Sequence, residues 1–171
     1  MNQKILVTYA SRAGSTAEVA LRIGAVLREQ NLDVDILPVK QVKSLQDYKA
    51  VIAGSAVRMG SWLPEAVDFV KHNQQSLNEL PCAFFSVYLM NMGDDEASRH
   101  VHEAYLSAAR ALVKPHKEAY FSGVGNPEKL GMFERMIGKM VKSPEGDFRN
   151  WESIRSWAAE VGSDFAVKAQ V

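Results

Sequence analysis

Three hydroxyl side chains surround one glycine in the segment Ser11-Arg12-Ala13-Gly14-Ser15-Thr16. An apolar run over residues 4–9 precedes this segment and a helical pattern follows it, so its backbone N–H groups would lie at a helix N-terminus. Hydroxyls and free N–H groups in that place predict a site for a phosphate monoester. The segment has neither the Gly-Lys-Ser/Thr ending of a Walker loop nor the G-x-G-x-x-G pattern of a dinucleotide site. The alternative is a turn in which Ser15 and Glu18 form a capping box.

A second candidate segment, residues 54–62, is punctuated by glycines and keeps short side chains until Arg58. A planar ligand would fit against such a loop, with backbone amides facing ring heteroatoms and Met59 or Trp62 against its face. A third segment, residues 86–93, offers an apolar and aromatic wall. A glycine-rich turn and a buried strand end are the alternatives for these two segments. The candidate cofactor-binding residues in them are Ser55, Ala56, Val57, Arg58, Met59, Gly60, Ser86, Val87, Tyr88 and Leu89, to which we add Gly123.

The elements that must position these segments alternate along the chain as strand and helix. Helical patterns begin near Thr16, Pro64, Asp95 and Asn150, and β-rich apolar runs predict strands at residues 4–9, 33–37, 49–55, 82–88 and 118–124. Strands separated mostly by helices imply right-handed crossovers and an α/β, doubly wound parallel sheet. A ligand of such a sheet lies beyond the carboxyl ends of its strands, where the candidate segments fall.

The composition excludes several classes of function. We expect the 171 residues to form a single domain with a sizeable core. Lys plus Arg and Asp plus Glu number 20 each, so the chain lacks the basic footprint of a nucleic-acid binder. One cysteine excludes an internal disulfide, and the four histidines, His100 and His102 included, show no metal spacing. The longest uncharged run, residues 80–93, is too short to span a membrane, which favours a cytoplasmic protein.

Residues 125–149 fit no element of this plan and far exceed the usual α/β loop of about 4–6 residues. Apolar residues recur at helical spacing, and four cations over residues 127–142 outnumber two acids. Such a helix suits an apolar, anionic substrate, or peripheral contact with an anionic membrane at its inner face. The alternative is a helix packed on its own domain. The apolar residues are Leu130, Phe133, Met136, Ile137, Met140 and Val141, and the cations are Lys129, Arg135, Lys139 and Lys142.

The motifs S-R-A-G-S-T, Y-K-A-V-I-A-G-S-A-V-R-M-G and F-F-S-V-Y-L resemble the three FMN loops of the flavodoxin family. The resemblance covers nearly the whole chain. The segments A-V-R-M-G and S-V-Y-L, the Met- and Phe-rich insertion and G-D-F-R-N-W-E resemble more closely the flavodoxin-type, menaquinone-dependent protoporphyrinogen oxidases of bacteria. Two positions depart from the patterns: ordinary flavodoxins carry threonine at the place of Ala13, and the oxidases tend to have asparagine at the place of Tyr88.

The resemblance implies a flavodoxin-like sheet with strand order 2-1-3-4-5 over residues 1–171, helices on both faces, and one bound FMN. FMN is expected in preference to FAD or riboflavin because the first loop suits a terminal phosphate. The oxidase likeness implies an FMN-dependent oxidoreductase of heme biosynthesis that oxidises protoporphyrinogen IX with a quinone as acceptor. Arg58 would then steady negative charge on the reduced flavin or meet a substrate carboxylate. The alternative is a flavodoxin-type electron carrier, which the zero net charge and the basic insertion disfavour.

Overall fold

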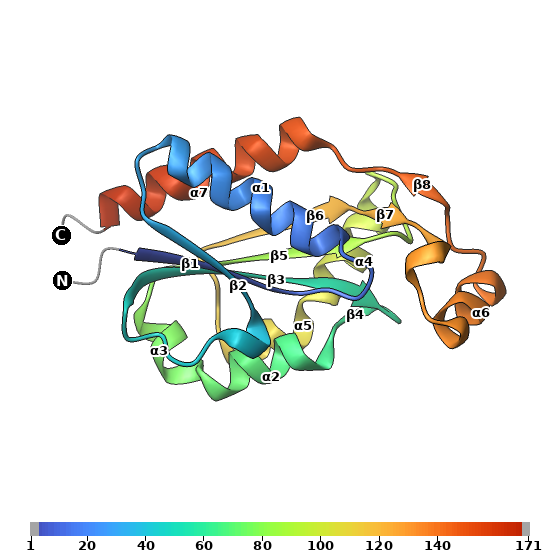
Figure 1. Ribbon diagram of the computed structural model, residues 1–171, viewed down its shortest axis with the longest axis horizontal. Coiled ribbons are helices and arrows are strands. Elements are labelled where there is room, and N and C mark those ends of the chain that lie inside the picture. Colours follow the sequence, from blue (N-terminus) through green and yellow to red (C-terminus); the bar gives the residue numbers. More distant parts are fainter. Residues whose placement is uncertain (1–3, 169–171) are drawn as a thin grey trace.

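The computed structural model of the chain describes residues 4–168, which are built around a sheet of five parallel strands (Figure 1). The sheet has the order β2-β1-β3-β5-β6, which confirms the predicted order 2-1-3-4-5. Every residue of β5 is buried, as expected for a parallel strand covered on both faces. The five strands are β1 (Lys4–Ala10), β2 (Val34–Pro38), β3 (Tyr48–Arg58), β5 (Cys82–Tyr88) and β6 (Lys117–Ser122).

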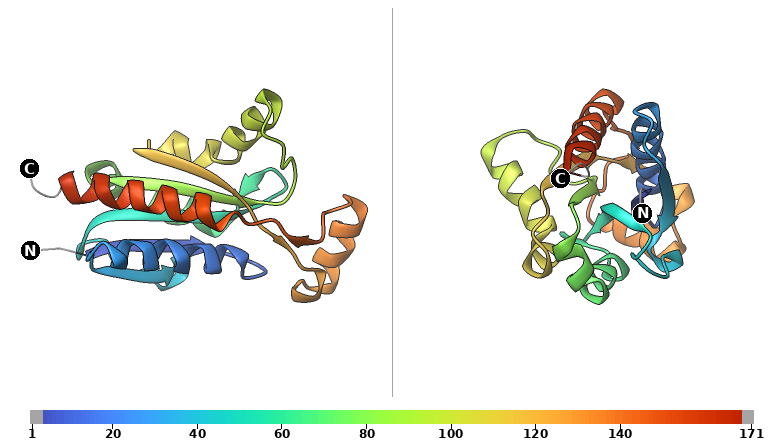
Figure 2. Two further views of the ribbon diagram at one scale, coloured as in Figure 1. Left: turned by 90° about the horizontal axis from the view of Figure 1, so that it is seen from above. Right: turned by 90° about the vertical axis from the view of Figure 1, so that its left-hand side faces the viewer.

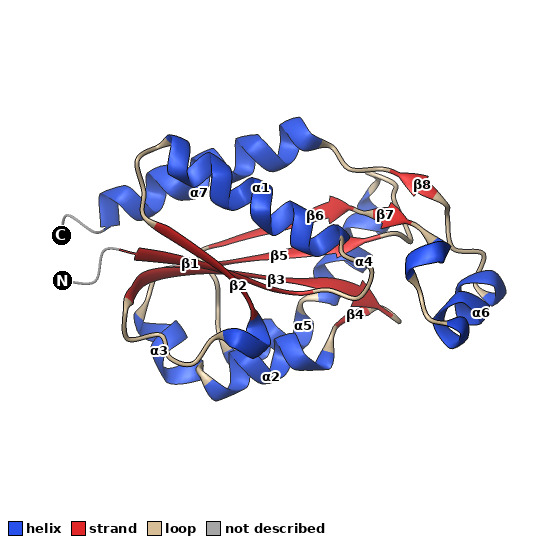
Figure 3. Cartoon of the chain, in the orientation of Figure 1, coloured by secondary structure: helices blue, strands red, loops and turns tan. Residues whose placement is uncertain are grey.

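Helices cover both faces of the sheet and divide its core in two (Figure 3). One face carries α1 (Ser15–Glu29) and α7 (Trp151–Lys168), which lie side by side in Figure 2. The other face carries α2 (Pro64–His72), α3 (Gln74–Glu79) and α5 (Ser107–Leu112), with a 3-10 turn, η1 (Val39–Gln41), after β2. A further helix, α4 (Glu96–Tyr105), precedes α5. Cys82 is buried beneath the second group of helices, and this burial raises the pKa of its thiol to about 11.

The third strand is longer than the sequence predicts. β3 continues to Arg58 and then turns back through Met59 and Gly60 into β4 (Ser61–Trp62), which pairs with it antiparallel. Both turn residues have positive φ, +50° and +75°, the pattern of a two-residue hairpin turn that follows the twist of the strands. Residues 54–62 are therefore mostly strand and hairpin, and the expected open loop over this segment is wrong.

The insertion forms a small unit beyond the carboxyl ends of the strands (Figure 1). Two short strands, β7 (Val124–Gly125) and β8 (Gly146–Asp147), pair antiparallel at its base. Between them lie a 3-10 turn, η2 (Pro127–Lys129), and α6 (Met132–Met140). The continuous helix expected over residues 127–142 is thus interrupted. Gly131 becomes the N-cap, and its N–H donates to the Glu134 carboxylate at 3.3 Å.

Candidate functional site

The backbone of residues 11–14, after β1, forms a tight turn that leads into the first residue of α1. Gly14 is the N-cap residue with φ +96°, a left-handed conformation that favours glycine. Its N–H donates to the Ser11 hydroxyl at 3.0 Å, which closes the turn. The predicted capping box of Ser15 and Glu18 is wrong, because Ser15 is already the first helical residue and no side chain caps α1. The first N–H groups of the helix are therefore available to an anion.

Thr16 supplies an unsatisfied hydroxyl beside these N–H groups. Its side chain is fully buried, and Oγ1 has no hydrogen-bond partner within residues 4–168. Leaving a buried hydroxyl unpaired costs about 1–3 kcal/mol, so the position favours a ligand that supplies an acceptor. A phosphate oxygen is such an acceptor, and the segment fits the phosphate of FMN. The Thr8 hydroxyl is orphaned as well, but Thr8 lies within β1, whereas Thr16 lies in the first turn of α1.

Arg12 links residues 11–16, called the phosphate segment below, to α2. Its guanidinium pairs with both carboxylate oxygens of Glu65, with Nη2 donating to Oε2 at 3.0 Å. This pair raises the pKa of Arg12 and lowers the pKa of Glu65. The negative charge of the Glu134 carboxylate contributes in the same direction to the raised pKa of Arg12. The sequence placed Arg12 at a phosphate, whereas in the structure its side chain is occupied by Glu65.

The β3–β4 hairpin is locked to the neighbouring strand by predicted site residues. Ser55, which is fully buried, accepts a hydrogen bond from Leu63 N at 3.0 Å and donates to Ala56 O at 2.8 Å. Ser86 is fully buried too and accepts from Trp62 Nε1 at 2.8 Å. Trp62 is only 4% exposed, so the interpretation of this ring as a ligand platform is wrong. What these residues offer a ligand is the backbone that their side chains hold in place.

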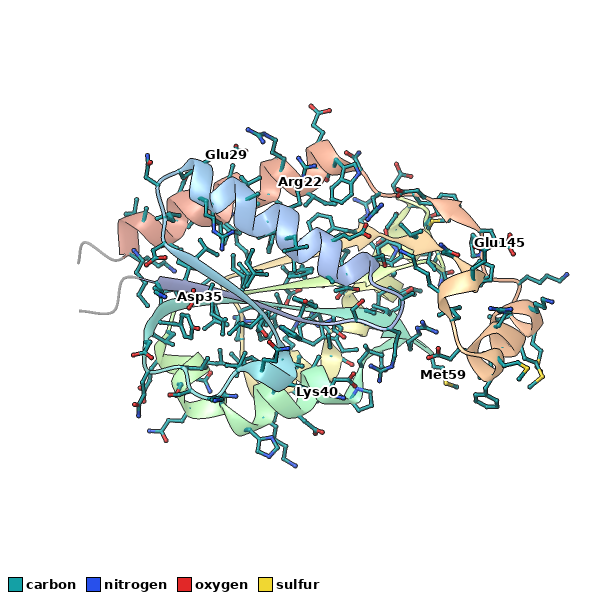
Figure 4. All side chains as sticks on the ribbon, in the orientation of Figure 1. Arg22, Glu29, Asp35, Lys40, Met59 and Glu145 are labelled. Atoms are coloured by element: carbon teal, nitrogen blue, oxygen red, sulfur yellow. The ribbon has the colours of Figure 1, made fainter. Side chains whose placement is uncertain are left out.

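The tip of the hairpin presents a cation and a thioether to solvent. Met59 is 96% exposed, and Figure 4 places it at the end of the molecule that carries the insertion. Arg58 is partly exposed, and its side chain has no hydrogen bond or ion pair with any residue that the structure describes. Val57 and Ala56 precede it, and Gly60 completes the turn. Arg58 is therefore free to meet a negative group at the carboxyl edge of the sheet.

The end of β5 is held by two aromatic residues that the sequence did not single out for binding. Tyr88 is 7% exposed, and its ring lies 4.3 Å from the ring of His102, centroid to centroid. Burial raises the pKa of the Tyr88 hydroxyl. His102 Nε2 lies 2.6 Å from Asn91 O, and the Tyr105 hydroxyl donates to Met90 O at 3.2 Å. These contacts fix the path of the segment that begins at Leu89.

From the sequence we named His102 only as one of four histidines without metal spacing, and we assigned it no role. The described residues contain no group of three or more acidic, histidine or cysteine side chains suited to a metal. His102 and Tyr105 are three residues apart on α4, a spacing that places both rings on one face of a helix. An aromatic pair at this spacing, directly after a strand that ends in tyrosine, was the available signal.

Gly123, directly after β6, forms hydrogen bonds to the end of β5 and to the last residues of the insertion. Its N–H donates to Tyr88 O at 2.7 Å, and its carbonyl accepts from Phe148 N at 3.1 Å. A Cβ at this position would lie 2.8 Å from a methyl of Val87 and 3.5 Å from the Ser15 hydroxyl, so the glycine permits a close approach. The position places Gly123 beside both the phosphate segment and the third candidate segment.

Arg149 links the C-terminal end of the insertion to α1. It donates to both carboxylate oxygens of Asp147, at 2.9 Å and 2.7 Å, and pairs with Glu18 of α1. The bond to Asp147 raises the pKa of Arg149. Its guanidinium also lies 4.5 Å from the Trp151 ring centroid, a cation–π distance. We predicted no role for this arginine from the sequence, although it lies in the motif G-D-F-R-N-W-E.

The structure thus brings the candidate segments together at the carboxyl ends of β1, β3 and β5, where a ligand of a doubly wound sheet lies. The phosphate segment is joined by the Arg12–Glu65 pair to α2, the helix that follows the β3–β4 hairpin. Gly123 brings the phosphate segment next to the end of β5. Within residues 4–168, no helix is both long and apolar enough to cross a membrane.

The model of the flavodoxin domain matches residues 6–151. Protoporphyrinogen IX dehydrogenase [quinone] from Escherichia coli (strain K12) is 24% identical over 174 residues, covering 92% of this chain and 94% of that protein. The protein of the same name from Leishmania major is 24% identical over 178 residues, covering 95% of this chain and 74% of that protein.

Solved structures share the fold at low sequence identity. The two-electron reduced flavodoxin of Megasphaera elsdenii superposes with a TM-score of 0.60 at 12% identity, covering 93% of this chain and 98% of that chain. The oxidised flavodoxin 1 of Bacillus cereus gives a TM-score of 0.58 at 16% identity, covering 94% and 97% of the two chains. The strand order, the site at the carboxyl edge and the domain match agree, and the chain belongs to the flavodoxin domain family, whose members bind FMN.

Proposed function

We propose that this protein is an FMN-dependent oxidoreductase that oxidises protoporphyrinogen IX and passes the electrons to a quinone. The observation that carries the cofactor assignment is the orphaned Thr16 hydroxyl beside the uncapped start of α1. The substrate assignment is supported by relatives named protoporphyrinogen IX dehydrogenase [quinone] that match nearly the full length of this chain.

Residues of all three segments would contact the bound FMN. The hydroxyls of Ser11, Ser15 and Thr16, with the N–H groups that open α1, would hold the phosphate. The backbone around Ser55 to Gly60 and around Ser86 to Leu89 would border the ring system. Bound FMN supplies the redox chemistry, accepting two electrons from the substrate and delivering them to the quinone.

The protein's own contribution to the reaction is positional and electrostatic. Arg58 offers a free guanidinium at the hairpin tip, where it would meet a substrate carboxylate or balance negative charge on the reduced cofactor. The three segments contain no His, Asp or Glu. A proton released from the substrate would therefore pass to water rather than to a side-chain base of these segments.

The second candidate is a one-electron carrier of the flavodoxin type, because the fold of the chain superposes on flavodoxins. Carriers steer encounters through a surface of one charge sign. Here the formal net charge is zero, and the insertion exposes Lys129, Lys139 and Lys142 beside apolar side chains. That surface favours the oxidoreductase.

Anaerobic mixing separates the two functions. The purified protein is loaded with FMN and mixed with protoporphyrinogen IX, and the first two-electron step is followed by the loss of flavin absorbance; porphyrin absorbance should rise once an acceptor allows further cycles. A soluble quinone is then added, and the flavin absorbance should return over repeated cycles. A protein that binds FMN but leaves protoporphyrinogen unoxidised would refute the proposed substrate and favour the carrier.

A further inference from the structure

The apolar side chains of α6 point away from the rest of the protein. Met132 is 87% exposed, Phe133 69%, Met136 53% and Met140 77%, and no residue of the helix is buried. With about 100° between successive residues, these four side chains fall within an arc of about 100°. Figure 4 shows sulfur-bearing side chains projecting from this outer end of the molecule. The sequence alternative that this stripe packs on its own domain is therefore wrong.

Cations border the apolar stripe. Arg135 and Lys139 lie along one edge of the stripe on the helical projection, and Lys129 and Lys142 flank the helix. The side chains of Lys129, Lys139 and Lys142 are exposed and form no hydrogen bond or ion pair with the part of the chain that the structure describes. Glu134, the acid of α6, lies on the side of the helical projection opposite the stripe and accepts from Gly131 N at the N-cap. The outward face of α6 is apolar and positively charged.

Exposed apolar side chains are concentrated in this part of the molecule. Residues 4–168 contain eleven large hydrophobic residues that are exposed, and six of these belong to residues 132–148. Met59, at the hairpin tip, adds a seventh at the same end (Figure 4). A contiguous apolar patch rimmed by charge marks a binding surface rather than ordinary surface composition.

We propose that α6 and its flanking turns dock the protein on the surface of an anionic lipid bilayer. A helix with an outward stripe of Met and Phe and a border of Lys and Arg lies in the plane of the interface, with its apolar side among the acyl chains. Its cations then meet the anionic headgroups. A second copy of this chain fits less well, because pairing two such faces would bring Lys139 and Arg135 of each copy near like charges.

Docking through α6 would also place the candidate redox site relative to the bilayer. This inference rests on the proposed function. α6, the tip of the β3–β4 hairpin and the phosphate segment all lie at the carboxyl edge of the sheet, and the start of β1 and the end of α7 lie at the opposite end of the molecule (Figure 1). Docking through α6 would hold the redox site next to the bilayer. A quinone dissolved in the membrane would then reach the site without entering water.

Flotation with lipid vesicles tests the docking on the full chain. Vesicles of phosphatidylglycerol and phosphatidylcholine should carry the protein, whereas vesicles of phosphatidylcholine alone should carry at least about tenfold less. Raising the salt concentration should weaken binding because it screens the headgroups. Two variants should each lower binding by about tenfold or more: Phe133→Ser with Met136→Ser and Met140→Ser, and Lys139→Glu with Lys142→Glu.

Matched controls change similar residues far from the insertion. Leu21→Ser with Val167→Ser removes two exposed apolar side chains, and Lys71→Glu reverses an exposed cation, so neither should alter vesicle binding. Circular dichroism and thermal unfolding check that each variant is folded. Wild-type protein that stays with the unbound fraction, or α6 variants that bind like wild type, would overturn the proposal. A dimer in light scattering that the α6 variants abolish, without vesicle binding, would also overturn it and identify a second copy as the occupant.

The experiments distinguish a failure of the docking proposal from a failure of the proposed function. Turnover of protoporphyrinogen with a water-soluble quinone needs no vesicles, so its presence without vesicle binding refutes only the docking. Vesicle binding without any turnover supports the docking and refutes only the proposed substrate.

Discussion

The indole of Trp62 donates a hydrogen bond to the Ser86 hydroxyl at 2.8 Å in a fully enclosed position between the β3–β4 hairpin and β5. The ring also packs on Phe84, with 5.3 Å between centroids. Two segments that would border the cofactor are therefore not independent loops. The path of one is set by a side chain of the other.

Trp62→Phe should destabilise the protein by about 1–3 kcal/mol, because the Ser86 hydroxyl is left buried without its donor. Urea unfolding of the cofactor-free protein measures the loss. Ser86→Ala in the Trp62→Phe background should restore part of the stability, since no unpaired hydroxyl then remains. Losses that simply add in the double variant would show that the two side chains do not interact.

Thr16→Val should weaken FMN binding by about tenfold while leaving the cofactor-free protein as stable as wild type or more stable. The substitution removes a hydroxyl that is buried and unpaired until a phosphate arrives. Fluorescence titration with FMN and riboflavin, together with thermal unfolding, makes the test. Thr8→Val is the control, because it removes the other orphaned threonine hydroxyl and should leave FMN affinity unchanged. Equal losses for FMN and riboflavin would show that Thr16 does not meet the phosphate.

The Arg12–Glu65 pair should make stability depend on pH in the acid range. The pKa of Glu65 is lowered in the folded protein, chiefly by its bond to Arg12, from an ordinary value of 4.5. Its contribution is therefore complete above the unfolded pKa and is lost as the pH falls through the folded pKa. Both groups are partly exposed, so solvent limits the effect to about 1 kcal/mol.

Urea midpoints measured between neutral pH and pH values below 4.5 test this dependence. Glu65→Gln should remove part of the acid loss seen for the wild type. Glu29→Gln breaks the more exposed pair with Arg155 and should leave the acid loss unchanged. An acid profile of Glu65→Gln that matches the wild type would contradict the prediction.

His102→Ala should loosen the segment after Tyr88 and weaken FMN binding several-fold. The substitution removes the ring that packs at a tilt against Tyr88 and the hydrogen bond to Asn91 O. Hydrogen exchange should become faster at residues 89–95, where the loop loses its anchor. His100→Ala, at a side chain that is 73% exposed, should change neither quantity. Unchanged exchange in His102→Ala would mean that β5 alone orders the loop.

Replacing residues 126–145 by a short Gly/Ser linker should leave the sheet folded and FMN bound. The α6 helix buries none of its residues, and β7 and β8 remain to close the base. Oxidation of protoporphyrinogen with a quinone should be lost, whereas reduction of the bound flavin by dithionite should persist. Wild-type turnover in this variant would show that the insertion has no part in substrate access.

The sequence predicted the sheet correctly because long apolar runs and helical periodicity report burial directly. It located Ser11 to Thr16 at a helix start, where the structure also places them. It misjudged the cap because a glycine with positive φ competes with a serine one residue later, and only the backbone path decides between them.

Other features depend on contacts between distant residues. The partner of Trp62 lies 24 residues away, and the partner of Arg12 lies 53 residues away. No local pattern encodes such pairs. The outward orientation of the α6 stripe was equally hidden, because periodicity shows that one face is apolar but not whether that face is covered.

The β7–β8 pair at the base of the insertion has an implication for how this molecule can change over time. With both strands fixed beside Gly123, the chain between them is a closed loop whose ends already meet. Doubling the length of such a loop costs only about 0.6 kcal/mol of closure entropy, while the sheet is untouched. Mutation can therefore lengthen, shorten or replace this segment with little effect on the sheet, so that specificity can change at its edge while the β1–α1 turn stays the same.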